Sequence, residues 1–296
     1  MAAISDLYHK FMATSVPLKL VIINFAIFIA LRLIGIIAMI GGWDINAVVD
    51  YLALPSPLDI LAQHPWTAVT YMFTHYEVFH IIFNMLTLYW FGKMLLLRCS
   101  NRQLVWLYIY GGLLGATFFL VGAQLFDGVG GWLLGASSAV IAIVIATAVL
   151  MPDFRISLFL IGSIQIKWVA IAAFLFFALG LVGDNAAAHI THFGGMTMGI
   201  IFALLLKNRI DITRPLNNLF DYISSFIKRC FIRKYNLRSK PKLKFKSKAS
   251  DTSTPASHAD DRRNLDAILD KIKHSGYTSL SADERKQLFD ISRRVK

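Results

Sequence analysis

Three short groups of polar residues interrupt three different apolar stretches of the chain. The groups are His80-x-x-x-Asn84, Gly135-Ala136-Ser137-Ser138 and His192-x-x-Gly195-x-x-x-Gly199. A serine hydroxyl is a weak nucleophile alone, and a neutral imidazole within hydrogen-bond reach activates it by accepting its proton and later returning it to the leaving group. His192 is the natural partner of Ser137. These residue types therefore suggest nucleophilic catalysis by a serine and a histidine.

The residues around Ser137 and His192 suit the same chemistry. A serine near a helix N-terminus has free backbone N–H groups and a positive dipole end beside it, which favour a developing oxyanion. Asn84 and His80 lie one helical turn apart and could add side-chain donors. The glycines remove side chains where membrane helices must approach closely, as small residues commonly do. They are Gly135, Gly195 and Gly199.

Taken singly, each group also has a structural explanation. A lone serine in a membrane helix often hydrogen-bonds to its own backbone, and glycines four residues apart are common in helix packing. Histidine and asparagine are costlier to bury in a membrane and by default suggest function. Because three such groups fall at the same end of three helices, the combination favours a functional site.

The composition places the elements that must position these residues in a bilayer. Of the 296 residues, 56% are hydrophobic, which is more than a water-soluble core of this length can bury. Stretches of roughly 20 apolar residues predict transmembrane helices. They run approximately over Pro17–Gly41, Val78–Leu97, Gln103–Leu125, Gly131–Met151, Ile166–Val182 and Ala187–Leu206. We predict an all-α polytopic membrane protein with six transmembrane helices, and an interfacial segment over Phe154–Gln165.

Orientation follows from the cations, because Lys and Arg accumulate on the cytoplasmic side. They flank the start of the first helix and fall between the second and third helices and between the fourth and fifth, as Lys10, Lys19, Lys93, Arg98, Arg102, Arg155 and Lys167. The alternate loops contain neither Lys nor Arg. Both termini are therefore expected in the cytoplasm of a multi-pass protein of the cell (inner) membrane. His80, Ser137 and His192 would then lie at one depth, roughly 5 to 10 Å below the external, periplasmic surface, toward which the site opens.

Four segments together resemble the rhomboid intramembrane serine proteases. They are the run Pro65-Trp-Thr-Ala-Val-Thr-Tyr-Met-Phe-Thr-His75, His80-Ile-Ile-Phe-Asn84, Gly135-Ala-Ser-Ser138 and His192-Phe-Gly-Gly195. The resemblance implies a six-helix rhomboid-like bundle and a Ser137/His192 dyad without a third carboxylate. It also implies an oxyanion site made by the Ser137 backbone N–H with His80 and Asn84, and an acyl-enzyme formed with single-span or polytopic membrane-protein substrates.

The sequence departs from the rhomboid pattern at two places and leaves alternatives open. Thr67 follows Trp66 where the family often has Arg, and Ser138 replaces a frequent Gly. A non-catalytic rhomboid-like protein that binds membrane helices is the main alternative. A transporter would be expected to show repeated halves, and we see none. His189 has the spacing to replace His192 as the base, but the trailing glycines favour His192.

No cofactor or metal is expected. The histidines could in principle bind zinc, but the His-Glu-x-x-His pattern of the membrane metalloproteases is absent. Arg32, in the first apolar stretch, remains unexplained by the sequence.

The predicted domains are a cytoplasmic segment, 1–16, the membrane domain, 17–206, and a cytoplasmic tail. The tail comprises a basic amphipathic interfacial helix over 207–235, a flexible linker over 236–261 and a small helical hairpin over 262–296. The net charge of +12 comes mainly from the tail and makes anionic lipids a natural partner, whereas no nucleic-acid module is recognisable. The hairpin resembles an appendage of some bacterial rhomboids and is too small for a substantial core, so a partner or self-association is expected there.

Overall fold

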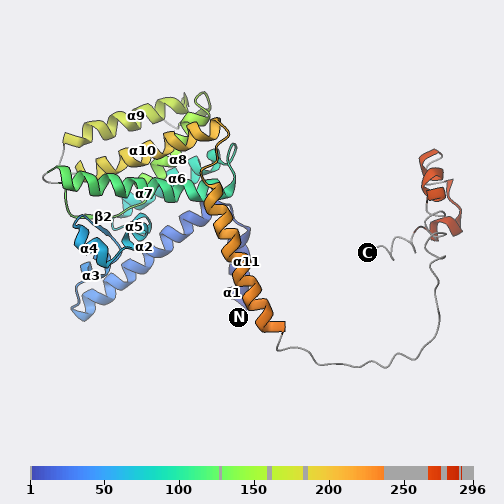
Figure 1. Cartoon of the computed structure of the whole chain (residues 1–296), viewed down its shortest axis with the longest axis horizontal. Coiled ribbons are helices and arrows are strands. Elements are labelled where there is room, and N and C mark those ends of the chain that lie inside the picture. The colour runs from blue at the N-terminus through green and yellow to red at the C-terminus, as the bar shows by residue number, and fades with distance from the viewer. Residues whose placement is uncertain are drawn as a thin grey trace. The chain divides into compact units, whose positions relative to one another are not determined.

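The computed structural model of the chain is mostly helical (Figure 1). It describes residues 2–126, 129–158, 162–182, 186–236, 266–274, 279–286 and 288. The chain divides into two compact units, Met1–Phe231 and Ile232–Lys296. The first unit contains all the residues singled out for chemistry, and it determines how the site is built.

Four helices of the first unit are long and apolar enough to cross a membrane: α2 (Val16–Gly41), α6 (Val78–Leu95), α7 (Asn101–Leu125) and α10 (Ala186–Lys207). Two shorter apolar helices accompany them, α8 (Ser137–Leu150) and α9 (Ile166–Leu179). Large apolar side chains cover the exposed faces of α2 and α9, for example Ile37 and Phe176. Such contiguous apolar surface is stable in lipid rather than in water. The protein is therefore a multi-pass membrane protein.

Helix α8 begins later than the apolar pattern predicts. Residues from Gly131 were expected to be helical, but Gly131 and Gly135 have φ angles of +112° and +118°, which end any right-handed helix there. Between them, strand β2 (Trp132–Leu133) pairs antiparallel with strand β1 (Leu54–Pro55). A 14-residue helix remains, about 21 Å long.

Helix α8 occupies the middle of the bundle. It contacts α6, α7, α9 and α10 (Figure 1). Every residue from Ser138 to Ala148 is buried, and most of them are Ala, Val or Ile. Because other helices cover it on all sides, its length does not have to match the thickness of the lipid. The first residue of α8 is Ser137.

The connection from α2 to α6 is built from short elements. They are α3 (Asn46–Asp50), β1, α4 (Leu58–Gln63), α5 (Thr67–Thr70) and the 3₁₀ helix η1 (Tyr71–Phe73). The Trp66 indole donates to the Tyr51 carbonyl at 2.9 Å, and the Tyr71 and Met72 side chains are completely buried. This compact segment places Tyr71 and His75 beside the start of α8.

Other connections are short and regular. Strands β3 (Arg155–Leu158) and β4 (Gly162–Gln165) form an antiparallel hairpin before α9, where an interfacial segment was expected. A 3₁₀ helix, η2 (Gly180–Val182), follows α9, and helix α1 (Ala2–Ala13) precedes α2. Helix α7 begins with a capping box, in which Ser100 and Gln103 bond reciprocally.

Helix α11 (Arg214–Asn236) follows α10 and is tied to the start of α7 by polar side chains. Arg102 makes two bonds to the Asp221 carboxylate, at 2.7 and 2.9 Å, and the Trp106 indole donates to Asn217 at 2.8 Å. The Arg102 guanidinium holds the pKa of the Asp221 carboxyl below its usual range. The predicted amphipathic helix therefore has one face against the bundle.

The second unit includes the last residues of α11, from Ile232, and further described helical segments over 266–274 and 282–286. Ile268 and Leu280 are buried, and Lys271 forms an ion pair with Glu284 at 2.8 Å. Ser281 and Glu284 bond reciprocally, which forms a capping box at the start of the second helix. The predicted linker, apart from residue 236, and the remaining parts of the hairpin lie outside the described residues.

Candidate active site

Gly135 shapes the turn before Ser137. Its φ of +118° lies in a region that residues with a side chain rarely adopt. A Cβ atom at Gly135 would also lie 2.7 Å from Cε1 of His80. Glycine is thus required both for the turn and for the approach of the His80 ring.

The same turn is held by the segment that precedes α6. The Gly135 N–H donates to the Tyr71 carbonyl at 2.9 Å, and the Ala136 N–H donates to Nε2 of His75 at 3.2 Å. Burial, and secondarily the nearby His80 ring, hold the pKa of His75 below its usual range. His75 is therefore neutral at neutral pH and can accept this bond.

The two adjacent serines have different surroundings. Ser138 is completely buried, with its hydroxyl 3.1 Å from that of Tyr71, which in turn donates to the Gly112 carbonyl at 2.6 Å. Ser137 is half-buried and lines a pocket with the His192 ring. The Ser138 hydroxyl is therefore engaged in a buried contact with Tyr71, whereas the Ser137 hydroxyl is accessible from the pocket.

His192 meets Ser137 directly. Its Nε2 lies 2.8 Å from the Ser137 hydroxyl oxygen. The Phe177 ring of α9 covers the imidazole, with the centroids 4.1 Å apart. The buried Nδ1 atom of His192 has no hydrogen-bond partner among the described residues. Ring packing, rather than a carboxylate within that part of the chain, holds the imidazole in place.

Close backbone contact between α10 and α8 brings the two side chains together. A Cβ atom at Gly195 would lie 2.2 Å from the Ser138 carbonyl oxygen, and one at Gly199 would lie 2.6 Å from the Ala142 carbonyl oxygen. Both positions therefore exclude any side chain. Since Gly195 follows His192 by about one turn, this contact sets the depth of the imidazole beside Ser137.

One pocket of about 640 Å³ joins all four polar residues predicted to take part in chemistry. It lies between α6, α8, α9 and α10, and its polar members are Thr87 and the four predicted residues His80, Asn84, Ser137 and His192. The Asn84 amide donates one hydrogen to the His80 carbonyl at 2.9 Å, which leaves its second hydrogen for another acceptor. Apolar side chains complete the wall: Phe83, Phe91, Val140, Ile141, Val144, Val169, Ala173, Phe176 and Phe177.

His189 does not line this pocket. Its ring packs near those of Phe177 and Phe176, at centroid distances of 5.9 and 6.3 Å. Across the described residues, no group of three or more His, Cys, Asp or Glu side chains is arranged to hold a metal ion. The pocket therefore offers a hydroxyl, imidazoles and an amide for chemistry.

Three contributors to the site were not identified from the sequence. Tyr71 and His75 hold the turn before Ser137, and Phe177 packs on His192. The first two fall within the Pro65–His75 run that carries the rhomboid resemblance, which was the available signal. No sequence pattern distinguishes Phe177 from the other phenylalanines of its helix.

Comparison with known families matches two parts of the chain. Residues 251–294 match a family of unknown function (DUF6576). Residues 62–209, half of the chain, match the Rhomboid domain family. A comparison with curated proteins finds no match. The Rhomboid match contains the whole polar pocket and the glycine contacts that assemble it, and the chain belongs to the rhomboid family.

Proposed function

We propose that the protein is an intramembrane serine endopeptidase that cleaves transmembrane or membrane-adjacent segments of other membrane proteins. The observation that carries the proposal is the 2.8 Å contact between His192 Nε2 and the Ser137 hydroxyl at the wall of a pocket. A nucleophile and base within hydrogen-bond reach are the signature of covalent catalysis.

In the proposed reaction, the Ser137 oxygen attacks a substrate carbonyl while His192 Nε2 takes the hydroxyl proton. The negative charge moves to the carbonyl oxygen of the tetrahedral intermediate. The Ser137 backbone N–H, the free hydrogen of the Asn84 amide and the His80 side chain would stabilise that charge. His192 then gives its proton to the leaving amine as the peptide C–N bond breaks. A water molecule next attacks the acyl carbonyl while His192 takes its proton, and His192 returns that proton to the Ser137 oxygen as the ester bond breaks.

The scheme requires one tautomer of His192. A base at Nε2 requires the ring proton on Nδ1, the buried atom that has no partner in the described part of the chain. A carboxylate normally fixes this tautomer in a triad. Here the contact between His192 and Phe177 would fix the ring orientation instead. Ser137 and His192 would thus act as a dyad.

The pocket suits part of a membrane-embedded peptide. Its wall is mostly apolar, and His80, Asn84 and His192 line it together with Ser137, the first residue of α8. A helical substrate must unwind locally to expose a carbonyl to Ser137, because the carbonyls of an intact helix are hydrogen-bonded. Helix-destabilising segments with a small residue before the cleaved bond are the substrates that we expect from the family resemblance.

The membrane arrangement that we propose has six crossings, with α8 and α9 completing the four long helices. The buried α8 can start below the membrane surface because it does not face lipid. The loop cations favour cytoplasmic termini. Ser137 would then open toward the external, periplasmic side of the cell membrane.

The C-terminal part would act at the cytoplasmic surface. Leu219, Phe220, Ile223 and Phe226 of α11 are exposed apolar residues on a helix that is otherwise rich in polar and basic residues. Such a helix suits a surface of anionic lipids. Residues 262–296 would bind a partner or a second copy of the chain.

The test is incubation of the purified protein with a panel of labelled single-span membrane proteins, with product masses measured. We expect the wild type and His189→Ala to cleave, and Ser137→Ala and His192→Ala to be inactive though folded, since the dyad acts as a unit.

A fluorophosphonate probe provides a second measurement that does not depend on choosing the right substrate. The adduct should map to Ser137, and Ser138→Ala should still be labelled. Cleavage that survives in Ser137→Ala would refute the mechanism. Absence of both cleavage and labelling in a folded wild type would favour the non-catalytic binding protein.

A further inference from the structure

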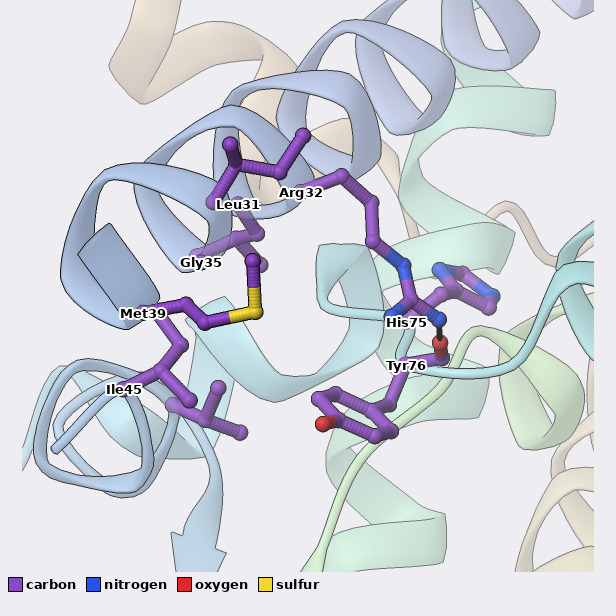
Figure 2. Close-up of a pocket in the computed structure, with 9 residues that line it drawn as sticks. Leu31, Arg32, Gly35, Met39, Ile45, His75 and Tyr76 are labelled. Carbon is purple, nitrogen blue, oxygen red and sulfur yellow. Dashed lines mark hydrogen bonds between the residues drawn. The ribbon is translucent and has the colours of Figure 1, made fainter.

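Arg32 is a charged residue on the outer face of an apolar helix. It is the only Lys or Arg of α2 after Lys19. Its Nη2 donates to the Tyr76 carbonyl, and its guanidinium lies over the rings of Tyr76 and Phe28, 4.7 and 5.2 Å from their centroids (Figure 2). The ion pairs found among the described residues do not include Arg32. Its charge is therefore not neutralised by a carboxylate in that part of the chain.

Arg32 borders a pocket of about 400 Å³ outside the site described above. We call it the Arg32 pocket, and it is lined by Leu31, Arg32, Gly35, Ile36, Met39, Ile45, Val49, His75 and Tyr76. Figure 2 shows the Met39 side chain and the Tyr76 ring on opposite sides, with Arg32 reaching across from α2. Ile36 and Met39 are exposed, so the pocket is accessible from the outer face of the helix.

The position of Arg32 along α2 indicates which molecules can reach it. Helix α2 has 26 residues and is about 39 Å long, longer than the roughly 30 Å hydrocarbon layer. Arg32 lies about 13 Å before the end of the helix, and long basic side chains extend toward the membrane surface. Its guanidinium can therefore reach the headgroup region, where phosphate groups are abundant.

The chemistry of the pocket selects an amphiphile. A guanidinium binds phosphate oxygens through two parallel N–H bonds, and Arg32 keeps donors beyond the one used by Tyr76. The apolar wall beside it, including Gly35, Met39 and Ile45, has no donor for a hydrophilic anion. We propose that the Arg32 pocket binds one phospholipid of the bilayer, with its phosphodiester at Arg32 and the start of an acyl chain against Gly35 and Met39.

Binding here would also act on the candidate active site. Arg32 holds the carbonyl of Tyr76, the neighbour of His75, and His75 accepts the N–H of Ala136 next to Ser137. The bound lipid would fix the Arg32 side chain and, through it, this segment. The binding proposal itself does not rest on the proposed proteolysis.

The test uses the full-length protein in lipid nanodiscs that contain phosphatidylglycerol with a photoactivatable diazirine near the headgroup end of one acyl chain. After illumination, adducts are mapped by mass spectrometry. In the wild type we expect adducts on Ile36, Met39 or Ile45. Labelling there should fall at least roughly tenfold in Arg32→Gln, because charge-assisted hydrogen bonds are lost.

A second variant tests the shape of the pocket without changing its charge. A Cβ atom at Gly35 would lie 3.6 Å from Ile45, an ordinary contact, so the first carbon of a side chain fits there without displacing the protein. Gly35→Leu fills the pocket and should reduce labelling as Arg32→Gln does. Lys93→Gln, on α6, removes a charge elsewhere and should leave labelling unchanged. Thermal unfolding identifies any variant that fails to fold. If Arg32→Gln does not fold, the labelling of Gly35→Leu is the deciding measurement.

Two further labelling experiments identify the chemical class of the ligand. Diacylglycerol with the same diazirine chain lacks the phosphate and should label at least roughly tenfold less. Inorganic phosphate should not compete, because it has no acyl chain. Equal labelling by diacylglycerol, undiminished labelling in folded Arg32→Gln, or displacement by inorganic phosphate would each overturn the proposal. So would displacement of the lipid probe by a membrane-protein segment that crosslinks at the same residues.

Discussion

Replacing Gly195 by alanine should abolish the proposed proteolysis without changing Ser137 or His192. The added Cβ would lie 2.2 Å from the Ser138 carbonyl oxygen, whereas real Cβ contacts are essentially never below 3.0 Å. Helices α8 and α10 must therefore separate by about 0.8 Å or more. A shift of that size along the line from Ser137 to His192 lengthens their 2.8 Å contact to about 3.6 Å, where a hydrogen bond is lost.

The expected effect is large on rate and moderate on stability. A misplacement of about 1 Å can lower turnover by about 10²-fold, while overpacking of this kind costs about 1–3 kcal/mol. Turnover and the rate of fluorophosphonate labelling should fall together in Gly195→Ala. Gly130→Ala, whose Cβ makes an ordinary contact at 3.6 Å with the Ser56 hydroxyl, is the control and should keep both rates. Wild-type rates in a folded Gly195→Ala protein would show that the helix contact does not set the dyad geometry.

Three further predictions concern other parts of the chain. Asn84→Ala should lower turnover by roughly 10² to 10³ with little change in KM, because an oxyanion donor acts mainly in the transition state; steady-state kinetics measures this, and unchanged turnover would exclude the role. Burial, and to a smaller extent the nearby His80 ring, lowers the pKa of His75 in the folded protein. As the pH falls through about 6.5, His75 therefore takes up a proton in the unfolded chain but not in the folded one. Stability should therefore decline below that pH, less steeply in His75→Gln, as thermal unfolding across pH can show. Truncation after Asn236 should leave cleavage of a detergent-solubilised substrate intact, because the active-site residues all lie in the first unit; loss of activity with that unit folded would show that the tail contributes to catalysis.

The hydrophobic pattern predicts the helices better than it predicts their ends. Helices α2, α6, α7 and α10 begin and end within a few residues of the apolar stretches, because lipid-facing helices must be apolar over most of their length. The start of α8 was placed six residues too early. The backbone of Gly131 and Gly135 and the pairing of β2 with β1 depend on contacts with the segment before α6, and an apolar count cannot show them.

The four pocket residues proposed to take part in chemistry were all identifiable from the sequence. His80, Asn84, Ser137 and His192 are polar side chains in apolar stretches, where each needs a partner or a function. Their catalytic roles remain predictions. Sequence spacing left His189 as an alternative base. The three-dimensional structure distinguishes the two histidines, because His192 contacts Ser137 while His189 packs near Phe176 and Phe177.

The segment from Tyr71 to His80 explains why the Ser137 turn can keep one conformation. Gly135 in the left-handed region is conformationally free in isolation, yet here its N–H is held by Tyr71 and its Cα faces the His80 ring. His75 takes the next N–H, that of Ala136. These contacts come from residues more than fifty positions away along the chain, so they form only when the membrane domain is assembled. A serine held in this way is preorganised by the fold, and the two serines differ because the Ser138 hydroxyl contacts that of Tyr71 while Ser137 lines the pocket.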